Sequence, residues 1–209
     1  MTSPAGARRA PGRPAQISRD QIFEAVSSSE NLDTLTMREL AGRLNVSHGA
    51  LYRWVKNRDE LFDLISEVLI DRIVAPEQKA DPDWRPRLAR IAWLMHDQFL
   101  ALPGYATHLS RPHAHNAHSI GRLHRAIITA FLDAGVSADL AEQSWYIFIT
   151  SVVSWLAFQE NRLNLGPRAP RFDLFLDALL RGLPAREPGT GRPPSLPAAF
   201  PAILMHGSD

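Results

Sequence analysis

The sequence predicts an all-α protein with an N-terminal three-helix domain of the helix-turn-helix kind and a larger C-terminal helical domain. Two observations predict this class. Apolar residues recur at helical spacing through most of the chain, and no run of alternating apolar and polar residues indicates strands. Short polar side chains suited to capping helices precede most of these periodic segments. We therefore expect a helix-turn-helix domain over 18–65 and a helical domain over 66–183.

The residues outside these two domains have a different composition. Residues 1–17 are rich in Pro, Gly and Ala and carry arginines but no acidic residue, which predicts a flexible basic arm. Residues 184–209 are again rich in Pro and Gly, which predicts a disordered tail.

Composition excludes several classes of function. The chain has no cysteine, so disulfides and cysteine chemistry are excluded. No apolar run reaches the length of a membrane span, and no apolar segment follows the basic N-terminus as a secretory signal requires. The net charge of +1 by itself gives no argument for nucleic acid. We expect a cytoplasmic protein without a membrane segment.

Helix starts are well marked. Three pairs have the form of a capping box: Ser18 with Gln21, Thr36 with Glu39, and Asn57 with Glu60. Asp81-Pro82 offers a cap followed by proline, and Ser137 follows the breaker Gly135. The predicted helices are 18–29, 36–43, 47–54, 57–74, 82–101, 116–134, 137–163 and 171–182, with a further short helix over 103–110.

The segment 36–62 has the pattern of two short helices joined by a tight turn. Leu40 and Leu44 share one helix face, and Asn45 can adopt the left-handed conformation that such a turn needs. Ser47 caps the following helix. This arrangement predicts a helix-turn-helix whose second helix enters the major groove of DNA.

The second helix has side chains that suit the groove. Gly49 and Ala50 are small enough for close approach, Ala50 can touch a thymine methyl, and His48 can donate to a guanine acceptor. Side chains at the starts of the neighbouring helices suit phosphate: Thr36, Arg38, Lys56 and Arg58. The same spacing also fits a plain helical corner, in which Tyr52 and Trp54 would be core aromatics and the arginines a solvated face.

The run from Ser18 to Ile65 resembles the N-terminal domain of the TetR family of transcriptional regulators. It contains that family's LTMRELA, NVS and GALY segments and the K-N-R-x-x-L entry to the fourth helix. The resemblance implies that Trp54 packs in the core. It implies DNA contacts from Thr36, Arg38, Ser47, His48, Gly49, Ala50, Tyr52, Arg53, Lys56 and Arg58.

The basic arm adds a further candidate DNA contact. Gly12-Arg13-Pro14 resembles the core of an AT-hook, in which an extended arginine enters an A·T-rich minor groove. We therefore add Arg13 to the DNA-binding set. The alternative is a leader that contributes only non-specific attraction to DNA.

Two helices of the C-terminal domain predict a homodimer. The helix 137–163 is apolar nearly all round, so it must be buried on more than one side. The helix 171–182 carries an apolar stripe. Two such helices from each of two copies would form a four-helix interface, and two DNA-binding domains would then read a palindrome.

The C-terminal domain also resembles the ligand domain of tetracycline repressors, over Trp84–Pro112 and again over 133–155. That family places a magnesium-site histidine where this chain has Val74, so we do not predict a magnesium–tetracycline complex. We expect a mostly apolar pocket for a small-molecule effector between the fourth, fifth, seventh and eighth helices. The candidate lining residues are Trp93, His96, Phe99, Leu100, His108, Leu109, Arg111, His124, Ile127, Ile128, Phe131, Trp145, Phe148, Ile149 and Val152.

Five histidines lie close together in the sequence, at positions 108, 113, 115, 118 and 124. Imidazoles at such spacing suit zinc or nickel, although no carboxylate or cysteine lies among them. A helical metal-binding protein or enzyme, or a helical interaction module, is therefore the alternative from another class. We assign no metal site and no cofactor, and no catalytic motif supports an enzyme.

Together, motif and resemblance predict a transcriptional regulator that binds a palindromic double-stranded DNA operator as a homodimer. We expect a repressor that a small molecule releases by moving the helix 57–74, which joins the two domains. A ligand-dependent activator is the alternative within the class.

Overall fold

The structure is a computed structural model that describes residues 17–75, 83–111, 117–161 and 170–187, and in these ranges all regular structure is helical. The helices are α1 (Arg19–Ser27), α2 (Met37–Arg43), α3 (His48–Leu51), α4 (Arg58–Ile73), α5 (Trp84–Leu100), α6 (Tyr105–Leu109), α7 (Ala117–Asp133), α8 (Ala138–Asn161) and α9 (Phe172–Gly182). Arg13, His113, His115 and most of the predicted tail lie outside the described residues. No described helix is long and apolar enough to cross a membrane.

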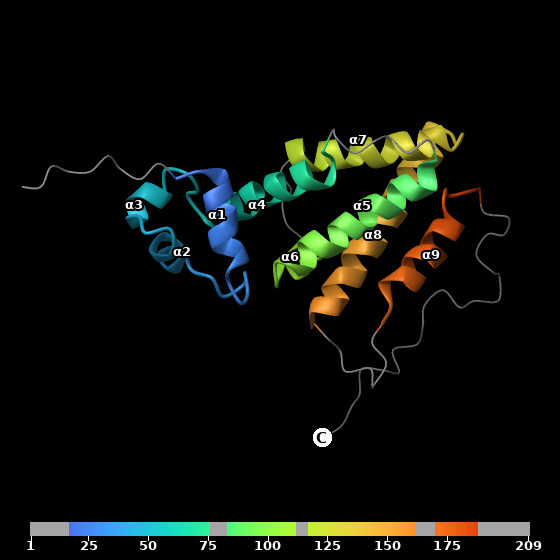
Figure 1. Cartoon of the computed structure of the whole chain (residues 1–209). Coiled ribbons are helices and arrows are strands. Elements are labelled where there is room, and N and C mark those ends of the chain that lie inside the picture. Colours follow the sequence, from blue (N-terminus) through green and yellow to red (C-terminus); the bar gives the residue numbers. More distant parts are fainter. Residues whose placement is uncertain (1–16, 76–82, 112–116, 162–169, 188–209) are drawn as a thin grey trace, which may run out of the picture.

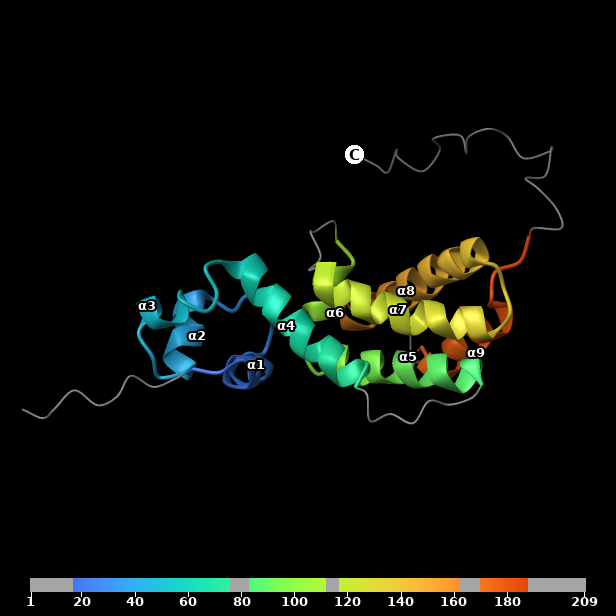
Figure 2. The same ribbon diagram turned by 90° about the horizontal axis from the view of Figure 1, so that it is seen from above.

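The molecule is elongated, with α1, α2 and α3 at one end and α5 to α9 at the other (Figures 1 and 2). In the N-terminal part, α1 packs against α2 and α4, and α2 packs against α3. Their core contains fully buried apolar side chains from each helix and from the turns: Ile22, Leu40, Leu51, Val55 and Ile65. This packing confirms the predicted all-α, two-part architecture.

The predicted caps account for most of the helix starts. In α1 and α2 both halves of the capping box form, between Ser18 and Gln21 and between Thr36 and Glu39. At α4 only half forms: the Asn57 side chain accepts from the Glu60 N–H at 2.8 Å. The Glu60 carboxylate instead accepts from the backbone N–H of Lys56, at 2.7 Å.

Several predicted helix boundaries differ from the structure by two or three residues, and two of these differences have an identifiable cause. The α-helix of α3 ends at Leu51, and residues 52–54 continue as a hydrogen-bonded turn rather than as helix. The fifth helix begins at Trp84 rather than at 82, because Asp83 supplies the cap by accepting from the Arg85 N–H at 3.2 Å.

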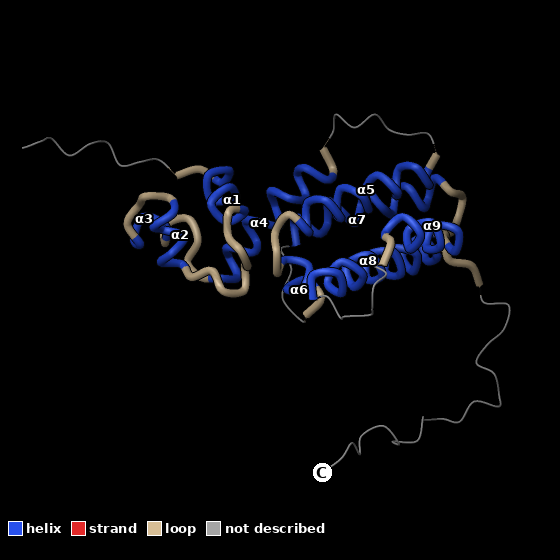
Figure 3. The backbone as a smooth tube through the Cα atoms, turned by 60° about the horizontal axis from the view of Figure 1, so that its bottom comes forward, coloured by secondary structure: helices blue, strands red, loops and turns tan. Residues whose placement is uncertain are grey.

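The C-terminal domain is built around α8. One face of α8 buries Trp145, Phe148, Val152 and Leu156, and the helix packs against α5, α6 and α7. The tube view places α5 and α7 on one side of this bundle and α8 with α9 on the other (Figure 3). The Trp155 and Phe175 rings join α8 to α9, with 5.8 Å between their centroids.

The helix α4 belongs to both domains. Its first half buries Leu61 and Phe62, and its second half buries Ile70 and Ile73. Ion pairs add to this packing on the α1 side, where Arg19 lies 2.8 Å from Glu67. A single apolar cluster therefore runs through both domains. Because this core is closely packed, a displacement of α4 must alter the packing in both domains.

A second connection joins the α1–α2 loop to the α5–α6 loop. The Leu32 N–H donates to the Pro103 carbonyl at 2.8 Å. Gly104 has φ +94°, and a Cβ atom there would lie 2.6 Å from the Asn31 side-chain oxygen. Glycine is required at this position both for its conformation and for the close approach of the two loops.

Candidate functional site

The end of the molecule formed by α2 and α3 exposes most of the predicted DNA-binding side chains. His48, Gly49, Tyr52 and Arg53 are exposed, and Ala50 is half-buried. The His48 and Tyr52 rings lie 4.4 Å apart between centroids, so they form one aromatic unit on the helix surface. Nothing lies within 4 Å of a Cβ built on Gly49, so the absence of a side chain leaves open space on the outer surface.

Backbone geometry positions this surface. Asn45 has φ +51°, the left-handed conformation expected of it, and turns the chain between α2 and α3. The Ser47 side chain caps α3 by accepting from the Ala50 N–H at 3.2 Å. Thr36 caps α2 in the same way, and Arg38 is exposed in the first turn of that helix. The Thr36 hydroxyl and backbone N–H both donate to the Glu39 carboxylate at 2.8 Å, so the exposed Arg38 is the group of this helix start that can meet a phosphate.

The two cations at the start of α4 have different environments. The Lys56 side chain is 78% exposed, and its ammonium lies 3.9 Å from Glu60. Arg58 is half-buried and donates to the carbonyls of Leu32 and Leu35, with the Leu35 bond at 3.1 Å. Arg58 therefore connects the α1–α2 loop to α4. The sequence predicted only a phosphate contact for this residue and not this structural role.

The interpretation of Trp54 as a core residue is wrong. Its side chain is 43% exposed, whereas the next residue, Val55, is fully buried. The reason is that α3 ends at Leu51, so helical spacing no longer decides which later residue points inward.

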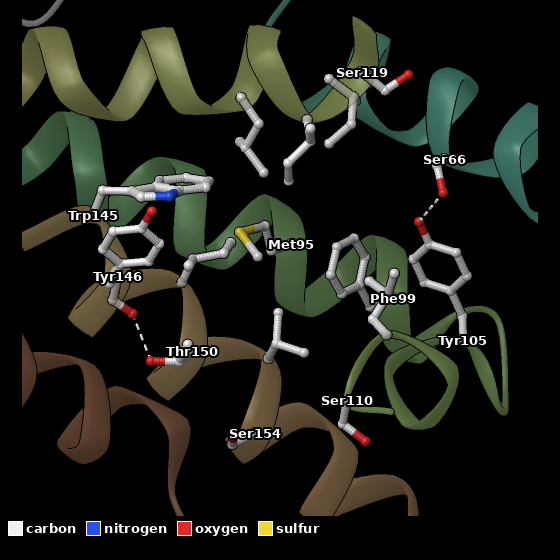
Figure 4. A pocket seen from close by; sticks show the side chains of 16 residues that line it. Ser66, Met95, Phe99, Tyr105, Ser110, Ser119, Trp145, Tyr146, Thr150 and Ser154 are labelled. Carbon is white, nitrogen blue, oxygen red and sulfur yellow. Dashed lines mark hydrogen bonds between the residues drawn. The ribbon is translucent and has the colours of Figure 1, made fainter. Parts of the chain in front are cut away.

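A cavity of about 370 Å³ lies in the C-terminal domain, between α4, α5, α6, α7 and α8 (Figure 4). It is bounded by the helices that we predicted, with α6 in addition. Its lining residues are Ser66, Ile70, Met95, Phe99, Tyr105, Leu109, Ser110, Ser119, Ile120, Leu123, Trp145, Tyr146, Ile149, Thr150, Val153 and Ser154.

Only part of the predicted pocket lines this cavity. The matching residues are Phe99, Leu109, Trp145 and Ile149. Four other predicted residues are fully buried among the helices and fill the core instead: Ile127, Phe131, Phe148 and Val152. Leu100 and Ile128 are half-buried against the same core. On these helices the core face and the cavity face are adjacent and both apolar. The spacing of apolar residues alone therefore does not show which residue belongs to which face.

The polar and aromatic residues of the prediction lie elsewhere. Trp93 and His96 pack against Phe172 of α9, with ring centroids 4.9 and 4.6 Å apart. His124 of α7 lies 2.9 Å from a Glu142 oxygen of α8. These three side chains hold helices together outside the cavity.

Two further predicted pocket residues bind the N-terminal domain. His108 stacks on Phe62 with 3.6 Å between ring centroids, and an Arg111 nitrogen lies 3.6 Å from Asp33. Neither residue lines the cavity. Both instead attach the end of α6 to the N-terminal helices.

Sequence reasoning missed the hydroxyl groups of the cavity. Tyr146, Thr150 and Ser154 recur at intervals of four along α8 and share a face that looks into the cavity. The signal was present, since Thr150 and Ser154 interrupt an otherwise apolar helix. Polar residues in such a helix indicate a face that borders a cavity or solvent and does not pack in the apolar core.

The cavity lining contains a hydrogen-bonded pair of hydroxyl groups, from the fully buried Tyr105 and the half-buried Ser66. The Tyr105 hydroxyl of α6 and the Ser66 hydroxyl of α4 are 2.8 Å apart. Burial is the main cause that raises the pKa of Tyr105 above its ordinary value, so the phenol stays neutral. This pair links α4 to α6 across the end of the cavity.

The histidine stretch was the basis of the metal-binding alternative. In the part of the chain that the structure describes, no three His, Asp or Glu side chains are grouped so that they could hold a metal ion. His113 and His115 lie outside that part, so the alternative that rests on them stays a prediction.

Part of the sequence is similar to a known transcriptional repressor. No protein-family model matches the sequence. The HTH-type transcriptional repressor DrrR1 of Streptomyces coeruleorubidus is 31% identical over 94 residues, which are 42% of this chain and 33% of that protein. The match thus spans about a third of the repressor's length.

Solved structures show the fold. The TetR family protein ActR of Streptomyces coelicolor, in complex with (S)-DNPA, superimposes with a TM-score of 0.64 at 22% identity, covering 80% of this chain and 97% of that one. BioQ with its double-stranded DNA operator gives a TM-score of 0.62 at 23% identity, covering 82% and 100%. The chain therefore has the fold of TetR-family proteins, with an N-terminal helix-turn-helix domain and a larger C-terminal helical domain.

Proposed function

We propose that this protein is a ligand-responsive transcriptional repressor that binds a palindromic DNA operator as a homodimer, in the cytoplasm. One observation carries the proposal. The exposed face of α2 and α3 is connected through the single helix α4 to a bundle that contains a cavity of about 370 Å³. A DNA-reading surface and a ligand site are thereby joined by one rigid element.

The comparisons support both halves of this proposal. The relative DrrR1 is a transcriptional repressor, BioQ binds a DNA operator, and ActR binds a small molecule in its complex. We assign the DNA contacts to Thr36, Arg38, Ser47, His48, Gly49, Ala50, Tyr52, Arg53 and Lys56. The exposed Trp54 joins this set, and Arg58 supports the surface from behind.

The proposed mechanism is a two-state switch. A ligand that prefers the cavity of one state shifts α4, and the two DNA-binding domains of the dimer change their separation. Their recognition helices must lie about 34 Å apart to enter successive major grooves. Ligand and DNA then oppose each other by one coupling free energy, typically about 1–3 kcal/mol.

Selection of bound DNA from a random duplex pool tests the proposal. The wild-type protein should enrich a palindrome. The variant Tyr52→Ala with Lys56→Ala should not, while Arg186→Ala, which removes an exposed charge beyond α9, should enrich the same sequence. A wild-type protein that enriches nothing at moderate salt, with or without added small molecules, would contradict DNA binding.

A further inference from the structure

The cavity carries a chemical signature that identifies the class of its ligand. None of its described lining residues is acidic, basic or histidine. An ionised ligand would lose its hydration there without gaining a counter-charge, which strongly disfavours binding. The negative charge of Asp63 acts on Tyr105 of the lining, and it works against an anion in particular.

The lining is aromatic at both ends. Figure 4 shows Trp145 and Tyr146 at one end, Phe99 and Tyr105 at the other, and Met95 between them. Aromatic rings favour stacked or edge-to-face contacts with another ring, and a methionine sulfur favours a ring edge. A flat aromatic molecule can make such contacts along the whole length of the cavity.

Two hydroxyl groups of the lining, those of Thr150 and Ser110, are biased toward accepting hydrogen bonds. The Thr150 hydroxyl donates its proton to the Tyr146 carbonyl at 2.5 Å, and the Ser110 hydroxyl donates to the Thr107 carbonyl at 2.8 Å. Each oxygen keeps lone pairs for a further bond. A ligand that donates to these oxygens leaves the existing bonds of the chain intact.

Resting on the proposed function, we infer that the cavity takes an uncharged aromatic molecule bearing hydrogen-bond donors, such as a phenol, in preference to an organic anion or cation. The volume suits this class, because small-molecule pockets begin at about 300 Å³. Tyr146 both lines the cavity and is 52% exposed, so the cavity reaches the surface beside its phenol ring.

Four probes with the same naphthalene ring test the inference by equilibrium dialysis against the full chain. They are 2-naphthol, 2-methoxynaphthalene, 2-naphthoate and 2-naphthylmethylammonium. We expect 2-naphthol to bind most tightly and the two ions to bind roughly 100-fold more weakly or not at all, because no lining charge offsets their desolvation. An ion that binds as tightly as 2-naphthol, or a failure of all four to bind, overturns the inference.

Two variants locate the bound probe. Thr150→Val should weaken 2-naphthol roughly 2- to 10-fold, as one hydrogen bond is lost, and leave 2-methoxynaphthalene unchanged. Thr129→Val is the matched control, because the Thr129 hydroxyl also donates to a carbonyl four residues back, at 2.8 Å, but lies outside this cavity. Equal effects of the two variants would overturn the inference.

A filled cavity gives an independent readout. Val153→Trp, with its fold checked by circular dichroism, should abolish 2-naphthol binding, and binding that survives it lies elsewhere and refutes the assignment. DNA binding is measured on the same samples without any probe. A protein that binds 2-naphthol in the cavity but no DNA would refute the proposed repressor function and leave the ligand class standing.

Discussion

Gly49 is the residue at which stability and DNA binding should oppose each other. It lies in the first turn of α3 with open space around it, so a methyl group there meets no atom of the chain. Gly49→Ala should raise the free energy of unfolding by up to about 1 kcal/mol, because alanine loses less entropy in a helix. It should also weaken operator binding by about tenfold or more, since a lost base contact is worth about 1–3 kcal/mol.

Denaturant unfolding and a DNA-binding titration of the same variant measure both effects. Gly182→Ala at the end of α9 is the control, since a Cβ there also meets nothing within 4 Å. It should leave DNA binding unchanged. If Gly49→Ala binds the operator as well as wild type does, the first turn of α3 does not approach the bases.

Glu39 should make the stability of the N-terminal domain depend on pH. Hydrogen bonds from Thr36 hold the pKa of its carboxyl below the ordinary value. The folded state therefore favours the ionised form. Its contribution is complete above the unfolded pKa, about 4.3, and is lost as the pH falls through the lower folded pKa. Glu39→Gln cannot titrate, so its unfolding free energy should fall less than that of wild type between neutral and acidic pH.

Denaturant unfolding at several pH values measures this difference. Glu187→Gln, an exposed substitution beyond α9, is the control and should follow the wild-type curve. Parallel curves for Glu39→Gln and wild type would show that the capping box contributes nothing that depends on charge.

Individual residues also show how far the sequence predicts the site. Asn45 was predictable, because a left-handed residue between two helices favours asparagine. The exposure of Trp54 was not predictable, because α3 ends at Leu51 and helical periodicity does not apply beyond that residue. The carbonyl partners of Arg58 lie 23 and 26 residues earlier in the chain, at a range that local patterns do not encode.

Among the elements, α6 connects the cavity to the N-terminal helix-turn-helix domain. Tyr105 and Leu109 line the cavity, while His108 stacks on Phe62 near the start of α4. Glu160 at the end of α8 fixes α6 by accepting from the backbone N–H groups of Ala106 and Thr107, at 3.2 and 2.8 Å. A carboxylate at the start of a helix also interacts favourably with the positive end of the helix dipole.

Removing this carboxylate should release α6 selectively. Glu160→Ala should lower the free energy of unfolding by about 2 kcal/mol, as charge-assisted bonds are lost and the amides stay partly buried. Hydrogen exchange at the Ala106 and Thr107 amides should speed up by more than exchange in α2. Gln159→Ala is the neighbouring control. Uniform acceleration across the chain would show global destabilisation instead of local release.

At the same scale, sequence periodicity predicted the existence of the helices more reliably than their functional faces. The capping residues Ser18, Thr36 and Ser137 all stand at helix starts in the structure. The cavity was placed between the right helices, yet Phe148 and Val152 proved to be core. A helix that is apolar on every side has several buried faces, and only the packed neighbours decide which one meets a void.

The molecule as a whole exposes apolar side chains that a dimer would cover. Ile147 of α8 is 43% exposed and Leu174 of α9 is 58% exposed. Large side chains of this kind on two adjacent helices indicate an interaction surface. Ile147→Glu with Leu174→Glu should therefore yield a folded monomer, seen by sedimentation velocity, because a buried interface does not tolerate unpaired charges.

The same variant tests whether dimerisation is needed for function. Each monomer would retain its α2–α3 surface but would read a single half-site, so it should lose operator binding without losing its fold. Leu132→Glu on α7 is the matched control, since Leu132 is 44% exposed on a helix outside the predicted interface. That variant should remain dimeric and bind DNA. If the double variant stays dimeric while Leu132→Glu dissociates, the interface runs along α7. The separation of the two α2–α3 surfaces would then be set by that helix.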